Sequence, residues 1–89
     1  MWTVYVLQHD PSEQLYIGVT SDLKRRIEDH NEGRQTSTIR KSGQWILVYA
    51  EAYRDKLDAY EREKKLKHHG SAKNKLRERI RRSLLKSQK

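Results

Sequence analysis

Cysteine is absent from this chain of 89 residues. Without cysteine there is no disulfide framework and no cysteine-based zinc site, so neither an extracellular location nor thiol chemistry gains support. Long hydrophobic runs are absent as well, because the longest apolar stretch is residues 45–50 and a membrane-spanning helix needs roughly 20 apolar residues. The N-terminus lacks the basic region and the apolar stretch of a signal peptide. We therefore expect a cytoplasmic protein that does not contact a membrane.

Hydrophobic residues are few, and basic residues outnumber acidic ones. The hydrophobic share of 34% predicts one small domain, residues 1–89, with a modest core. Twenty lysines and arginines against twelve aspartates and glutamates leave a formal net charge of +8. Such an excess of positive charge favours polyanionic partners. Nucleic acid is therefore the expected partner, in preference to an anionic membrane surface.

Two segments near the N-terminus have the composition of β-strands. Residues 3–8 and 14–19 are rich in β-branched and aromatic side chains, and the turn-forming residues 9–13 separate them. This pattern predicts a β-hairpin. The expected register places Tyr5 opposite Tyr16, so that the two phenols share one side of the sheet.

The segment that follows the hairpin has the pattern of a short amphipathic helix at 21–32. Thr20 or Ser21 can cap its N-terminus, and Gly33 can close its C-terminus in the left-handed conformation. At about 100° per residue, one narrow stripe holds Leu23, Arg26, Ile27 and His30. Burying the flank of a guanidinium is costly unless a carboxylate or a phosphate meets it. Arg26 therefore predicts an anionic partner, which a substrate can supply.

The second half of the chain continues with a polar segment, a strand and a helix. Residues 34–43 are polar and have no period, which predicts a loop beside the site. Residues 45–53 are apolar at nearly every position, which predicts a central strand covered on both faces. A helix at 56–68 places Glu63 on the same stripe as its buried apolar residues and ends at Gly70. Glu63 is therefore expected to point inward.

A third helix is predicted at 72–86, with Ser71 as its cap. Its apolar residues repeat every four positions and form a narrow seam of Leu76, Ile80 and Leu84. The rest of its surface is basic, which predicts salt-sensitive contact with a phosphate backbone. The residues expected to make this contact are Lys73, Lys75, Arg77 and Arg81. The elements follow the order β-β-α-β-α-α, an α+β pattern.

Several of these residues stand in an order that is found in a known family. Tyr16-Ile17-Gly18 matches one family signature, and Thr3-Val4-Tyr5 keeps the tyrosine of the other without its Gly-Ile. Arg26 occupies the arginine position, and Arg62-Glu63-Lys64 looks like the segment with the metal-binding glutamate. Over residues 3–67 the chain resembles the GIY-YIG nuclease superfamily, most closely its small stand-alone members. The resemblance implies a three-stranded antiparallel sheet flanked by helices, and metal-dependent hydrolysis of a phosphodiester.

The resemblance marks five residues as catalytic candidates: Tyr5, Tyr16, Arg26, His30 and Glu63. Glu63 would hold Mg²⁺ or Mn²⁺ together with the substrate phosphate, and Arg26 would brace that phosphate. Tyr5 or Tyr16 would orient or deprotonate the attacking water, which requires a phenol pKa well below its usual value of roughly 10. His30 would hydrogen-bond the phosphate or protonate the leaving oxygen.

Three further positions bear on this interpretation. Val19 stands where some family members carry a lysine, so a mechanism that uses this lysine does not apply here. Asn74 is a shifted counterpart of a late asparagine that other members use. Adjacent His68 and His69 point about 100° apart on a helix and have no third ligand at a suitable spacing, so we reject a metal site there.

Structural explanations are open for two of the candidates. Arg26 can form an ion pair with Glu63 instead of binding a substrate. Glu63 can be an ordinary surface ion-pair partner, because its helix is rich in lysine and arginine. Glu61 lies two residues from Glu63 and competes for the metal-binding role, although it falls on a different stripe of the helix.

The leading functional hypothesis is a metal-dependent endonuclease that hydrolyses phosphodiester bonds in DNA rather than RNA. Branched, damaged or single-stranded DNA are the candidate substrates, and DNA repair is the candidate setting. The alternative is a non-catalytic nucleic-acid-binding module whose affinity comes from the basic C-terminal helix. A third hypothesis is that this helix docks an acidic protein partner that provides targeting.

Overall fold

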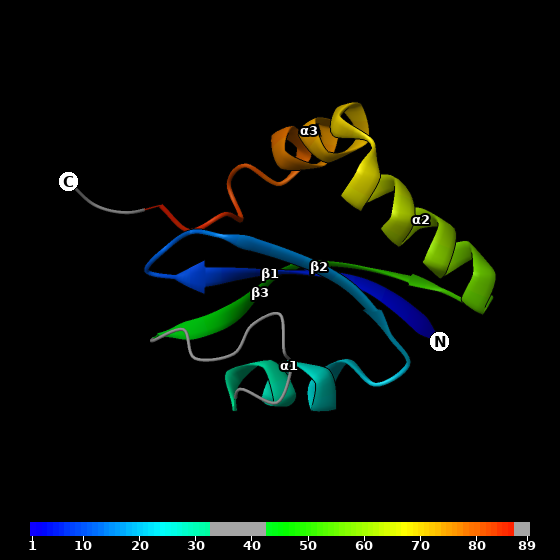
Figure 1. Ribbon diagram of the computed structural model, residues 1–89, viewed down its shortest axis with the longest axis horizontal. Coiled ribbons are helices and arrows are strands. Elements are labelled where there is room, and N and C mark those ends of the chain that lie inside the picture. The colour runs from blue at the N-terminus through cyan, green and yellow to red at the C-terminus, as the bar shows by residue number, and fades with distance from the viewer. Residues whose placement is uncertain (33–42, 87–89) are drawn as a thin grey trace.

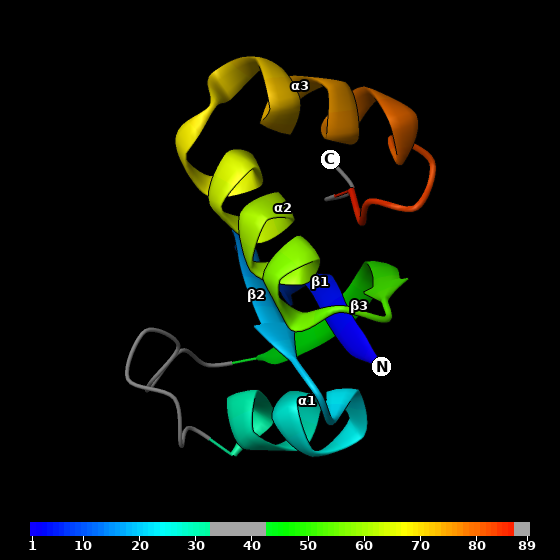
Figure 2. The ribbon, with the colours of Figure 1, turned by 90° about the vertical axis from the view of Figure 1, so that its right-hand side faces the viewer.

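The structure is a computed structural model that describes residues 1–32 and 43–86. Its elements are β1 (Trp2–Asp10), β2 (Leu15–Thr20), α1 (Leu23–Asn31), β3 (Gln44–Tyr53), α2 (Lys56–His68) and α3 (Gly70–Arg79). The three strands form one sheet, with α1 on one face and with α2 and α3 on the other (Figures 1 and 2). This arrangement confirms the predicted α+β fold and its element order. Within the two described stretches, no helix combines the length and the hydropathy that crossing a membrane requires.

The central strand of the sheet is β1. The strand order is β2-β1-β3, both pairs are antiparallel, and the residues of β1 from Val4 to His9 are buried. The prediction of a central strand at 45–53 is wrong, because β3 is an edge strand and its Leu47 is exposed. Apolar composition reports that a strand is buried on at least one face, but it does not report which neighbours the strand has.

The hairpin register differs from the expected one. Tyr5 lies opposite Gly18 and Tyr16 lies opposite Leu7, so the prediction that Tyr5 faces Tyr16 directly is wrong. The shift amounts to two residues, and side chains alternate between faces with a period of two. Both phenols therefore remain on the same face, as expected, with ring centroids 6.2 Å apart.

A β-bulge divides β3 into two halves. In one half the odd-numbered side chains face one side of the sheet, and in the other half they face the opposite side. Leu47 pairs with Leu7 and Tyr49 pairs with Val6, so Val48 is the extra residue between two adjacent positions of β1. An extra residue reverses which side chains point to which face. Trp45 consequently faces the same side as Tyr5, whereas Tyr49 faces the opposite side.

The two faces of the sheet have separate cores. The face under α2 and α3 carries the larger apolar cluster, which comprises Val4, Val6, Ile17, Ala59, Leu66, Leu76 and Ile80. The face that packs on α1 carries a smaller and more aromatic cluster of Tyr5, Leu7 and Trp45, with Tyr16, Leu23 and Ile27 packed against it. The apolar face attaches the helix pair, and the aromatic face holds the polar groups described below.

The helix at 56–68 is confirmed as α2, but its C-cap is His69, and Gly70, predicted to end it, is the first residue of α3. The ends of the other helices also need correction. Helix α1 begins at Leu23, and its cap is Asp22, whose carboxylate accepts a hydrogen bond from the backbone N–H of Arg25. Thr20 instead supports this cap, because its hydroxyl accepts a hydrogen bond from the backbone N–H of Asp22. Gly33 and the predicted loop at 34–43, apart from Gly43, lie outside the described residues.

Helix α3 is shorter than predicted. It begins at Gly70 without a side-chain cap, so Ser71 is not the cap, and it ends at Arg79 rather than at residue 86. After it, the chain turns back along β1, where the amide of Gln8 accepts from the backbone N–H of Leu85 at 2.6 Å and donates to its carbonyl at 3.2 Å. This pair of hydrogen bonds satisfies a buried amide. The spacing of four residues between Ile80 and Leu84 fits a continuing helix as well as it fits this turn toward β1, so the sequence could not show where α3 ends.

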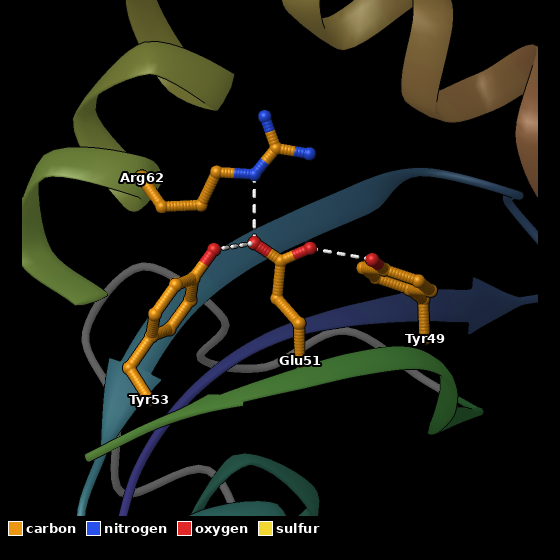
Figure 3. A network of polar contacts seen from close by, with 4 residues as sticks. All are labelled: Tyr49, Glu51, Tyr53 and Arg62. Carbon is orange, nitrogen blue, oxygen red and sulfur yellow. Dashed lines mark hydrogen bonds and ion pairs between the residues drawn. The ribbon is translucent and has the colours of Figure 1, made fainter. Parts of the chain in front are cut away.

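A polar network joins β3 to α2 on the larger apolar face (Figure 3). The carboxylate of Glu51 accepts hydrogen bonds from the hydroxyls of Tyr49 and Tyr53 and from Nε of Arg62, the last at 2.7 Å. Burial acts to raise the pKa of Glu51, but these three donors outweigh it and hold that pKa below its usual value. Burial and the hydrogen bond to Glu51 raise the pKa of Tyr53 to about 12. The network therefore contains one negative and one positive charge, which largely neutralise each other.

We expect Glu51→Gln to lower the free energy of unfolding by about 1–3 kcal/mol, because the amide replaces an acceptor of three donors with a group that also donates. Urea denaturation measures this change. The matched control is Glu78→Gln, which removes a carboxylate from an exposed pair with Arg81 and should change stability by less than about 0.5 kcal/mol. Equal stability of the two variants would contradict a structural role for the network.

Candidate active site

A buried hydrogen bond between β1 and α1 forms the base of the site. The hydroxyl oxygen of Tyr5 lies 3.0 Å from Nε2 of His30, and the two residues are 1% and 2% exposed. The ring of Tyr5 crosses over Gly18, so closely that a Cβ at this glycine would lie 2.5 Å from the phenol oxygen. Gly18 is therefore required because the phenol occupies the space of a side chain.

The end of α1 is attached to the start of β3 by Asn31. Its side-chain amide donates to the carbonyl of Trp45 at 3.1 Å and accepts from the N–H of Trp45 at 2.7 Å. This two-point contact sets the position of His30, one residue earlier on the helix. No signal in the sequence pointed to this role of Asn31, because its bonding partner lies 14 residues away along the chain.

Aromatic rings enclose His30. Its ring centroid lies 4.5 Å from that of Tyr16 in an edge-on arrangement and 6.4 Å from that of Trp45. Trp45 is buried beside these rings. Tyr16 is half-buried, so it is the more accessible of the two candidate phenols.

Arg26 is half-buried on α1 beside this cluster. It shares a shallow surface pocket with Thr20, Ser21, Asp22, Arg25 and Asp29. Within residues 1–32 and 43–86 its guanidinium makes no ion pair, so the structural alternative of an Arg26–Glu63 pair is not found. A half-buried guanidinium of this kind is suited to a ligand phosphate.

Glu63 reaches the site from α2, which packs on the other face of the sheet. Its carboxylate pairs with Nζ of Lys67 at 3.1 Å, and that ammonium lies 5.9 Å from the ring centroid of Tyr16. Because Tyr16 belongs to an edge strand, side chains from α2 can reach it past the border of the sheet. Glu61, the competing carboxylate, is exposed. Lys67 was missed in the sequence, although its spacing of four residues from Glu63 is the signal of a helical ion pair.

Electrostatic effects link these groups to one phenol. Burial raises the pKa of Tyr5, the neighbouring Tyr16 and Glu63 raise that pKa further, and Arg26 acts in the opposite direction. The expectation of an easily ionised phenol is therefore wrong for Tyr5, because burial outweighs the guanidinium. Burial and the charge of Arg26 lower the pKa of His30, so its ring is neutral at pH 7. The charges of Arg26 and Glu63 thus both act on the site around Tyr5.

The structure accordingly brings the five catalytic candidates together and leaves other singled-out residues elsewhere. Asn74 is exposed on α3, which covers the opposite face of the sheet, and so does not join the cluster. The basic residues predicted to bind nucleic acid also lie outside it, on α3 or the turn that follows: Lys73, Lys75, Arg77 and Arg81. The described residues contain no group of three or more histidine, cysteine, aspartate or glutamate side chains that could hold a metal ion.

Comparison with known proteins confirms the family resemblance and the fold class. Residues 1–77 match the GIY-YIG catalytic domain. The chain therefore belongs to the GIY-YIG nuclease family.

Within that family the similarity is to UPF0213 proteins. The chain is 38% identical over 48 residues to one from Serratia proteamaculans, covering 54% of this chain and 46% of that protein. It is 36% identical over 67 residues to one from Desulfotalea psychrophila, covering 74% and 60% of the two chains. The solution NMR structure of a UPF0213 protein from Bacillus halodurans superposes with a TM-score of 0.53 at 31% identity, covering 85% of this chain and 81% of that one. The chain spans about half the length of the first curated relatives it matches.

We expect Gly18→Ala to destabilise the protein by about 1–3 kcal/mol, because the added methyl group overlaps the phenol of Tyr5 and forces it from its place. Urea denaturation measures the loss, and the NMR signals of His30 report the broken hydrogen bond. Gly70→Ala is the matched control, since a Cβ there meets nothing within 4 Å. Equal effects of the two substitutions would show that the Tyr5–Gly18 contact does not require glycine.

The lowered pKa of His30 predicts a loss of stability in acid. The unfolded chain takes up this proton near its usual value of about 6.5, and the folded chain does so only at lower pH. The free energy of unfolding should therefore fall as the pH drops below about 6.5, and this contribution stops changing below the folded-state pKa. NMR titration of the ring and urea denaturation at several pH values measure both quantities. His30→Gln should show a shallower pH dependence, and a slope equal to that of the parent protein would contradict the assignment.

Proposed function

We propose that this chain is an endonuclease that hydrolyses phosphodiester bonds in DNA with the help of a divalent cation. The observation that supports this most directly is the convergence of Tyr5, Tyr16, Arg26, His30 and Glu63 around β2, although they come from both faces of the sheet. Family membership gives the reaction class, and the geometry suggests how the residues divide the work.

Arg26 supplies phosphate recognition in this proposal. Its guanidinium is half-buried and has no carboxylate partner among the described residues, so an entering phosphate would meet a charge that is still available. Guanidinium groups bind phosphate oxygens through two parallel hydrogen bonds, and this charge also stabilises the more negative transition state.

Glu63 is suited to a hard divalent cation, because its carboxylate offers oxygen ligands. It offers one carboxylate whose side chain is 18% exposed, and the described residues contain no group of three or more histidine, cysteine, aspartate or glutamate side chains that could form a complete protein cage. Mg²⁺ is commonly held by one or two carboxylates together with substrate phosphate and water, and Mn²⁺ accepts similar ligands. Such an ion, when bound, would neutralise charge on the phosphate oxygens. Lys67, which pairs with Glu63, would then release the carboxylate and remain close to the phosphate.

The Tyr5–His30 pair provides a route for the proton of the attacking water. Because the pKa of Tyr5 is raised, this phenol does not exist as a standing tyrosinate at neutral pH. The pKa of His30 is lowered, so its ring is neutral and one of its nitrogens can accept a proton. When substrate binding brings a water to the oxygen of Tyr5, a proton from this water would move to that oxygen while the phenol's own proton moves to Nε2 of His30. Tyr16, which is half-exposed beside them, would orient the water.

The alternative function is nucleic-acid binding without catalysis. The basic side chains on α3 favour it, since Lys73, Lys75 and Arg77 make no ion pair within residues 1–32 and 43–86. This function predicts affinity that is independent of metal and falls steeply with salt concentration.

We expect Glu63→Gln and Arg26→Gln to lower the rate of DNA cleavage about 100-fold or more, because each removes a charge that faces the reacting phosphate. Conversion of supercoiled plasmid to nicked and linear forms in Mg²⁺ or Mn²⁺ measures this rate. Glu61→Gln is the matched control, as it makes the same change on the exposed side of α2 and should retain activity. Equal cleavage by all variants, purified in parallel, would point to a contaminating nuclease and would refute the proposal. Binding without cleavage in the parent protein would support the alternative.

A further inference from the structure

A second cationic pocket lies between α2 and α3, on the sheet face opposite to Tyr5. The residues that line it are Arg62, Ser71, Ala72, Lys75, Leu76 and Arg79. Leu76 is buried and Ala72 packs against the same core, so these two form an apolar floor. The remaining lining consists of three cationic side chains and one hydroxyl, without an acidic residue.

Arg62 is already oriented in this pocket. Its Nε donates to Glu51 at 2.7 Å, and Figure 3 shows the two terminal nitrogens of the guanidinium pointing away from that carboxylate. Among the described residues these two nitrogens have no protein partner. Glu51 is occupied by two phenols as well, so the network holds the guanidinium plane in place and leaves its terminal N–H groups for a ligand.

The α3 side of the pocket follows from helical spacing. Ser71, Lys75 and Arg79 are separated by four residues each, which places them along one side of the helix. Neither Lys75 nor Arg79 makes an ion pair in the part of the chain that is described. The charge of Arg79 acts to lower the pKa of Tyr49, although burial raises it overall, so Arg79 lies close to the Glu51 network. The pocket therefore carries positive charge that Glu51 only partly offsets.

We propose that this pocket binds a phosphate group of a nucleic-acid backbone, at a site separate from the cluster around Tyr5. A planar guanidinium, an ammonium and a hydroxyl around a small depression match the oxygens of a phosphate in charge and in hydrogen bonding. The inference rests on the proposed function for the identity of the polyanion.

The position of the pocket relates it to the candidate active site. Arg62 and Glu63 are consecutive on α2 and point about 100° apart, so this one helix faces both sites. Two sites on different sides of one helix are separated by about the width of that helix, which is about 10–12 Å with its side chains. This distance corresponds to a few nucleotides of a strand. The pocket would thus hold the nucleic acid beside the bond to be cut. The four basic residues predicted to bind nucleic acid do not form one surface around this pocket. Lys75 faces the pocket, whereas Lys73 and Arg77 lie on the other side of α3.

The test uses the full chain with Glu63→Gln and with EDTA present, so that binding is measured without metal or cleavage. Inorganic phosphate is titrated first, with amide and Arg62 Nε–H signals followed by NMR, and a short DNA duplex is titrated second by fluorescence anisotropy. Lys75→Gln/Arg79→Gln removes two charges from the pocket. Lys73→Gln/Arg77→Gln removes the same charge from the opposite side of the same helix.

We expect saturable shifts at Ser71, Ala72 and Arg62 Nε–H with phosphate, lost in the pocket variant and retained in the control variant. The pocket variant should also lose about tenfold or more in duplex affinity at moderate salt, and the control variant clearly less. Absence of saturable shifts, or equal loss of duplex affinity in both variants, would overturn the assignment. Because no step requires cleavage, a protein that fails to cut DNA would leave this result interpretable.

Discussion

The arrangement of the candidate site depends on one buried hydrogen bond, between the phenol of Tyr5 and the imidazole of His30. Both partners are buried, and a buried polar group without a partner would cost about 1–3 kcal/mol. The central strand β1 and helix α1 must therefore keep a fixed relative position. Gly18 makes room for the ring, and Asn31 attaches the neighbouring residue of α1 to β3. The accessible groups are placed around this rigid base.

A narrow sheet lets one site draw residues from both of its faces. β1 is the central strand, and β2 is both an edge strand and the strand that carries Tyr16. Helix α2 packs over the apolar face, yet Lys67 lies near the ring of Tyr16, which faces α1. In a wider sheet, the side chains of α2 would be too far from those of α1 to share one site. The narrow sheet therefore contributes to the site, because a lysine or glutamate side chain on α2 is long enough to reach past the edge of the sheet to its other face.

Sequence patterns located the helices and the strands, but they did not give the order or the register of the strands. The stripe on α1 and the stripe on α2 depend on helical periodicity alone, so Arg26, His30 and Glu63 could be selected before any tertiary contact was known. The shared face of the two phenols survived a register error of two residues, because alternation has the same period. Strand order and the end of α3 could not be predicted, since they depend on which segments pair and on the contact between Gln8 and Leu85.

The sequence by itself determined the element order, the bounds of α2 and the inward positions of Arg26, His30 and Glu63, because these follow from local periodicity and composition. Only the tertiary structure decided how β3 divides between the faces. Its bulge at Val48 turns Trp45 toward His30 and Glu51 toward Arg62, although an unbroken strand would present both residues on one side. A bulge arises from pairing with the partner strand, and its effect on every later side chain is absent from the sequence of β3 taken alone.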